Sequence, residues 1–80
     1  MKISVTNKHI DDGIPCDRFQ CPLALAIQEA TGEYGWNVGM SNAYSPDVHR
    51  LRLPEKAIEF RKTFDCNGPV SPFEFDLDLV

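Results

Sequence analysis

The stretch CPLALAIQEATG, residues 21–32, predicts a helix with a marked beginning and end. Pro22 suits the first helical position, where its missing N–H group would have had no partner in any case. Cys21 is then the capping residue, and Gly32 is a typical terminator. The predicted helix, residues 22–31, is apolar on nearly all sides. Such a helix is buried on more than one side, and in so short a chain we expect a second subunit to cover part of it.

The segments around this helix predict the rest of the fold. Alternating apolar and polar residues are typical of half-buried strands, and a spacing of three and four residues is typical of a helix. The expected order is a strand at 1–6, a loop at 7–20, the helix at 22–31, strands at 36–40 and 48–53 joined by a loop at 41–47, a helix at 54–64 and a strand at 73–79. This β-α-β-β-α-β order predicts a single α+β domain, residues 1–80, of ferredoxin-like type. That fold is a two-layer sandwich with an antiparallel sheet and both helices on one face.

The charge of the chain limits its partners. The formal net charge is −4 at pH 7, with 12 acidic and 8 basic residues. Broad binding to a nucleic acid backbone or to an anionic membrane needs an excess of Lys and Arg, so neither is expected. A small anionic ligand remains compatible, because a local pocket can be positive on an acidic protein. The first residues lack the apolar core of a signal peptide, so we expect a cytoplasmic protein with reduced cysteines.

A row of carboxylates on the last predicted strand raises the question of a metal site. Glu74, Asp76 and Asp78 lie two residues apart, on one face of that strand. Carboxylates in one row do not converge on an ion unaided. We therefore expect cross-strand ion pairs instead, with Lys2, Arg50 and Arg52 as partners on the same sheet. These three basic residues lie on the outer faces of the other predicted strands.

Cys21 allows three interpretations. A thiol at a helix start can become reactive, and His9 and Arg18 could assist it. The cysteine can equally be a small buried cap without chemistry. The amide groups of the residues that follow, Leu23 first among them, could also hold an anion. A zinc site from three cysteines and one histidine is the remaining alternative, but its spacing resembles no usual zinc motif, and no metal or other cofactor is expected. Its ligands would be His9, Cys16, Cys21 and Cys66.

The segment from Trp36 to Arg50 offers groups that suit a nucleotide. Tyr44 is the expected exposed aromatic, on which a base can stack, and Arg50 can pair with a phosphate. Asn42 and His49 could contact polar edges. Trp36 is more typical of a core, and Gly39 would let another group approach the backbone closely.

The pieces HIDDG, CPLALAI, LPEKAIEF and FDCNGPVSPFEFDLD together resemble a family of small proteins of tailed phages. The resemblance covers nearly the whole chain and carries no established catalytic motif. It implies a phage-encoded protein, and small acidic phage proteins often bind and block something in the host. Phage sponge proteins, which sequester nucleotide-derived immune signals without cleaving them, are similar to this chain in size and in expected origin.

These observations predict a binding protein that is not an enzyme. The expected ligand is a host nucleotide-derived immune signal, and the expected assembly is a homo-oligomer with the site shared between subunits. The alternatives are an inhibitor that docks on a host defence enzyme through the acidic strand face, or an activity of the Cys21 thiol or of zinc. The residues expected to contact the ligand are His9, Arg18, Cys21, Leu23, Asn42, Tyr44, His49 and Arg50.

Overall fold

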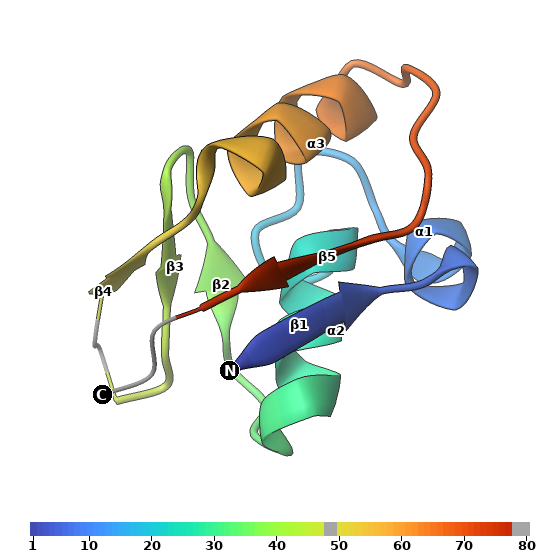
Figure 1. Cartoon of the computed structure of the whole chain (residues 1–80). Coiled ribbons are helices and arrows are strands. Elements are labelled where there is room, and N and C mark those ends of the chain that lie inside the picture. The colour runs from blue at the N-terminus through green and yellow to red at the C-terminus, as the bar shows by residue number, and fades with distance from the viewer. Residues whose placement is uncertain (48–49, 78–80) are drawn as a thin grey trace.

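The computed structural model describes residues 1–47 and 50–77 and has an α+β architecture (Figure 1). Within these residues there are three helices and two antiparallel sheets. The α+β class predicted from the sequence is therefore confirmed. The elements in chain order are β1 (Lys2–Val5), α1 (Asn7–Asp12), α2 (Pro22–Thr31), β2 (Asn37–Val38), β3 (Asn42–Tyr44), β4 (Arg50–Arg52), α3 (Glu55–Asp65) and β5 (Phe73–Asp76).

The first and last strands form a two-stranded ribbon. β1 pairs antiparallel with β5, and Ile3 lies opposite Phe75. Both of these side chains are buried, whereas the alternate residues of each strand are exposed. Beyond the strands, Met1 and Leu77 exchange two hydrogen bonds through their main-chain groups, of 2.9 and 2.8 Å. The expected strand at 73–79 is thus observed over Phe73–Asp76, and residues 78–80 lie outside the described part of the chain.

The second sheet has the order β2-β3-β4, and it corrects the expected topology. The segment 41–47 was expected to be a loop, but residues 42–44 form β3, whose central Ala43 is fully buried. A single small apolar residue gives a weak strand signal in the sequence. The described strands form two sheets, and β4 does not hydrogen-bond to β1 as the single four-stranded sheet would need. The ferredoxin-like arrangement, with a single sheet and both helices on one face, is therefore not confirmed.

The predicted helix at 22–31 is confirmed with both of its ends. Cys21 has an extended backbone, and its Sγ accepts a hydrogen bond of 3.4 Å from the amide of Ala24. Pro22 occupies the first turn, and Gly32 closes the helix with a left-handed backbone, φ 73°. Glycine adopts that conformation without steric cost. This local sequence therefore fixes where α2 begins and ends.

A helix that the sequence did not indicate covers part of α2. Residues 7–12, expected to belong to a loop, form α1. Thr6 caps it, and the side chain of His9 accepts the Thr6 amide at 3.0 Å, where glutamate or glutamine is usual. Because a histidine stands at this position, the sequence lacks the usual signature of a capping box. Because α1 packs on α2, the chain itself covers apolar surface that was assigned to a second subunit. The homo-oligomer stays a prediction, but the apolar surface of α2 that α1 covers no longer supports it.

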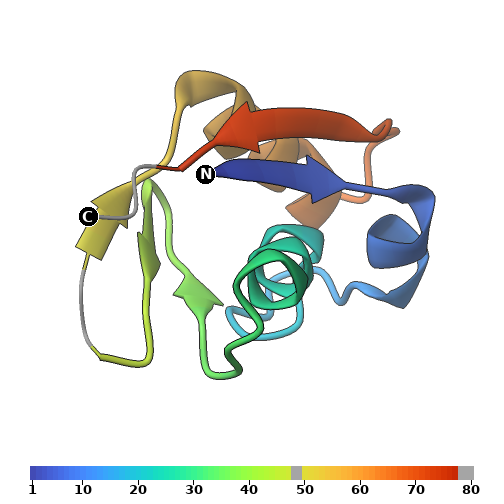
Figure 2. The same cartoon turned by 60° about the horizontal axis from the view of Figure 1, so that its bottom comes forward.

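The third helix is joined to the ribbon by aromatic side chains. α3 spans Glu55–Asp65, which is the expected range 54–64 shifted by one residue toward the C-terminus. The ring of buried Phe60 stacks on Phe73 of β5, with 4.8 Å between centroids. Figure 2 shows α2 beneath β1, against which it packs. No helix in the described ranges is long and apolar enough to cross a membrane.

Candidate functional site

One cleft is lined by residues from three separate parts of the chain, and two of these parts contribute charged groups. It has a volume of about 290 Å³. Residues 16–18 and Cys21 line it from the loop before α2, and residues 38–40 line it from the β2–β3 turn. Arg61 and Asp65 of α3 complete it. Two of the predicted site residues, Arg18 and Cys21, thus lie in one cavity.

Arg18 is fixed at the edge of this cleft by three contacts. Its carbonyl oxygen accepts the amide of Val38 at 2.9 Å, which joins the loop to β2. Its Nη2 donates to Oδ1 of Asn37 at 3.0 Å. The guanidinium carbon lies 5.5 Å from the centre of the Tyr44 ring, in cation–π geometry. The site was expected to be shared between subunits, but Arg18 and Tyr44 meet within one chain because β2 brings the loop and the hairpin together.

Tyr44 belongs to a basic face of the three-stranded sheet. Residues opposite each other on neighbouring strands share a face, and Tyr44 lies opposite both Asn37 and Arg50. Asn42, two residues away, shares that face with Arg52. The other face carries Val38, Ala43 and Leu51, which pack in or against the core. Within the described residues, no carboxylate forms an ion pair with Arg18, Arg50 or Arg52.

Gly39 keeps this arrangement close-packed. A Cβ atom at position 39 would lie 3.2 Å from Cε2 of Tyr44 and 3.4 Å from Nη2 of Arg18. The sequence predicted that Gly39 allows a close approach to the backbone, and the side chains of this chain make that approach. Trp36, expected in the core, is buried there. Met40, in the turn between β2 and β3, is exposed.

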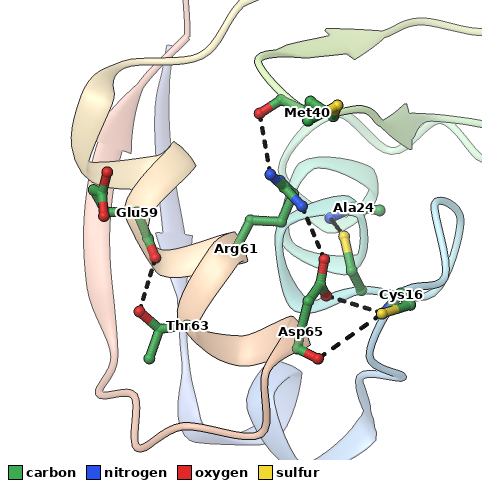
Figure 3. Close-up of polar contacts among 8 residues, drawn as sticks. Cys16, Ala24, Met40, Glu59, Arg61, Thr63 and Asp65 are labelled. Carbon is green, nitrogen blue, oxygen red and sulfur yellow. Dashed lines mark hydrogen bonds and ion pairs between the residues drawn. The ribbon is translucent and has the colours of Figure 1, made fainter.

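Arg61 and Asp65 line the cleft, and Figure 3 shows the polar contacts that they make. Nη1 of Arg61 donates to Oδ2 of Asp65 at 2.9 Å, and both side chains are more than four-fifths buried. Oδ1 of Asp65 accepts the amide of Cys16 at 2.9 Å. Nη2 of Arg61 is 3.4 Å from the carbonyl oxygen of Met40. Its Nε is buried and has no hydrogen-bond partner among the described residues.

The Cys21 thiol is in a poor place for reactivity. Its side chain is buried, and burial raises the pKa of the thiol above its ordinary value. The amides of Ala24 and Leu23 act in the opposite direction without outweighing burial. Because the Ala24 amide already bonds to Sγ, the helix start offers fewer free donors than expected. The interpretation of Cys21 as a buried cap therefore fits the geometry best.

His9 lies away from the cleft. It is 6% exposed, its Nδ1 accepts the Thr6 amide, and its Nε2 is 2.7 Å from Oε2 of Glu29. The bond to the amide makes Nδ1 an acceptor, so Nε2 carries the proton and donates to Glu29. Leu23 is fully buried and does not line the cleft either. His49 lies outside the described residues.

The zinc alternative is not supported by these positions. Nowhere in residues 1–47 and 50–77 do three His, Cys, Asp or Glu side chains gather to hold a metal ion. The ion pairs expected on the last strand are found in part. Nζ of Lys2 lies 3.9 Å from Oε1 of Glu74. Arg50 and Arg52 belong to the other sheet, so the expected pairing of these two arginines with the carboxylates across a common sheet is wrong. Asp78 lies outside the described residues.

The sequence did not single out Arg61, Asp65 and Asn37. Arg61 and Asp65 are four residues apart on a helix, a spacing that allows an ion pair, but many surface pairs share that spacing. Nothing in the sequence tells that this pair lines a cleft. Comparisons with protein-family models, curated proteins and solved structures find no match. The site is therefore interpreted from its own chemistry.

Proposed function

We propose that this protein binds a small anionic, nucleotide-derived ligand and holds it without cleaving it. The observation that carries the proposal is the patch formed by Arg18, Tyr44 and Arg50 on the basic face of the sheet. Arginine pairs with phosphate oxygens, and flat rings stack on tyrosine and arginine side chains. One patch therefore offers both kinds of contact that a nucleotide needs.

The charge distribution supports a small ligand over a polymer. The chain as a whole carries a formal charge of −4, which repels the long backbone of a nucleic acid. The arginines of the patch have no ion-pair partner among the described carboxylates, so a local positive field remains. A compact anion can meet that field without approaching the acidic surface elsewhere.

The cleft beside Arg18 sets the scale of the ligand. Its volume of about 290 Å³ is at the lower end of ligand pockets, which span roughly 300–1,000 Å³. Such a space suits the sugar–phosphate part of one nucleotide. The groups that the sequence singled out for chemistry favour binding over catalysis, because Cys21 is buried and His9 is engaged by Thr6 and Glu29.

The biological setting follows from the resemblance to phage proteins. In that setting the ligand is a nucleotide-derived immune signal in the host cytoplasm, and the protein acts as a sponge that lowers its free concentration. A homo-oligomer would place several such patches in one particle. This part of the proposal rests on the resemblance and not on the geometry of the cleft.

Isothermal titration calorimetry with AMP, ADP-ribose and a cyclic dinucleotide tests the proposal. At least one compound should bind, and Arg18→Ala or Arg50→Ala should weaken it by roughly tenfold or more, the value of one charge-assisted hydrogen bond. Lys8→Ala is the control, because it removes an exposed positive charge from α1. If no compound binds, or if both arginine variants bind as the parent does, the proposal is wrong.

The alternative of a protein inhibitor is favoured by one observation, the exposed carboxylate of Asp76 beside Glu74 on the ribbon. The two functions differ in what the protein releases. A loaded sponge that is denatured by heat should release an intact nucleotide, which chromatography detects. An inhibitor of a host enzyme should release none and should lose its effect in an Asp76→Lys variant.

A further inference from the structure

Arg61 supplies a second cationic group to the cleft that contains Arg18. Arg18 reaches the cleft from the loop before α2, and Arg61 reaches it from α3. The two guanidinium groups therefore have separate supports. A single cavity with two arginines from different elements can grip two points of one ligand.

Asp65 engages only one end of Arg61. Its carboxylate accepts from Nη1 at 2.9 Å, which leaves the edge made by Nε and Nη2. That edge has one contact at 3.4 Å, to the carbonyl oxygen of Met40, and Nε has no partner among the described residues. A contact of this length is weak, and a buried donor without a partner is costly. Nε, which is buried here, and Nη2 carry the parallel pair of N–H groups that can bind two oxygens of a phosphate or carboxylate.

The carboxylates of the cleft are already occupied. Oδ1 of Asp17 accepts the amides of Phe19 and Gln20, which shapes its own loop. Oδ1 and Oδ2 of Asp65 serve Cys16 and Arg61. Three of the four carboxylate oxygens of Asp17 and Asp65 thus accept hydrogen bonds, whereas donors on both arginines are available. Arg50 adds a further positive charge on the adjacent sheet face.

We propose that the ligand carries two linked anionic groups, one held by Arg18 and the other by the Nε–Nη2 edge of Arg61. A diphosphate, as in a nucleoside diphosphate or ADP-ribose, is the ligand chemistry that matches. This inference deepens the proposed function and rests on it. Binding of the second group replaces the contact of Arg61 with Met40, a residue of the β2–β3 turn that is 77% exposed.

Calorimetry with inorganic pyrophosphate and orthophosphate tests the inference directly. The parent should bind pyrophosphate at least tenfold more tightly than orthophosphate. Arg61→Lys keeps the charge but lacks the paired N–H groups, so this preference should fall at least fivefold. Lys62→Ala, which removes an exposed charge from the same helix, should leave the preference unchanged. Malonate serves as the dicarboxylate probe, and a tighter binding of malonate than of pyrophosphate overturns the assignment to a diphosphate.

Two matched variants keep the test decisive if Arg61→Lys does not fold. Asp65→Asn removes the negative charge that is paired with Arg61 and keeps an oxygen for the Cys16 amide, so pyrophosphate affinity should rise at least threefold. Asp17→Asn removes the same charge but frees no arginine, and its gain should be smaller. Equal gains, or equal affinities of the parent for the two phosphates, overturn the inference. If these tests fail while Arg18→Ala still weakens nucleotide binding, the proposed function stands and only the second anion site is wrong.

Discussion

Replacing Asp65 by alanine should destabilise the protein more than any other loss of a surface carboxylate. Asp65 is 18% exposed in its side chain, and its partner Arg61 is 15% exposed. Removing the carboxylate takes away a charge-assisted hydrogen bond, worth about 1.5–3 kcal/mol. It also frees the Cys16 amide, which water can partly satisfy, at a cost of about 0.5 kcal/mol. The expected loss is about 2–3.5 kcal/mol.

This loss is large for so small a protein. Eighty residues at about 0.05–0.15 kcal/mol per residue give a total stability of roughly 4–12 kcal/mol. The midpoint of thermal unfolding should fall by roughly 8–28 °C, since each kcal/mol shifts it by about 4–8 °C in this size range. Asp65→Asn keeps an acceptor for Cys16 and should cost about half as much. Urea titration followed by circular dichroism measures both variants.

The same helix supplies the control. Glu59 lies 3.8 Å from Lys62, and their side chains are 60% and 56% exposed. Glu59→Ala should therefore cost no more than about 0.5 kcal/mol, the usual value of an exposed pair. If Asp65→Ala costs no more than Glu59→Ala, the cleft is not held by the ion pair of Asp65 with Arg61, and the reasoning is refuted.

The remaining predictions concern the cysteines and the turn. Folding raises the pKa of the Cys21 thiol, so the unfolded chain loses this proton first as the pH rises above the ordinary value of 9.0. The free energy of unfolding should therefore decline with rising pH in the parent and decline less in Cys21→Ser. Urea titrations at pH 7 to 10 measure this difference. A thiol reagent at neutral pH should modify the exposed Cys16 and Cys66 quickly and Cys21 only after denaturation, and fast modification of all three would contradict its burial. Gly39→Ala should lower ligand affinity severalfold, because its Cβ crowds the Tyr44 ring; an unchanged affinity in calorimetry would place the ligand elsewhere.

Local signals in the sequence were sufficient for α2 and for the last strand. Pro22 at the first turn and Gly32 at the end act through the backbone of the helix itself, so no distant contact is needed to interpret them. The alternation of residues 73–76 likewise identifies which side chains are buried. α1 was missed because His9 replaces the usual residue of a capping box, and β3 because one alanine carries its burial.

The charge balance and the candidate groups Arg18, Tyr44 and Arg50 could also be read from the sequence, because residue type determines which chemistry a side chain can perform. That these groups lie close together could not be read from the sequence. The hydrogen bond between Val38 and Arg18 brings the loop to the hairpin, and the packing of α3 brings Arg61 and Asp65 to the cleft. Such contacts join residues that are 20 to 49 positions apart. Sequence spacing carries no information on them, so the tertiary structure alone decided which of the possible groups share a site.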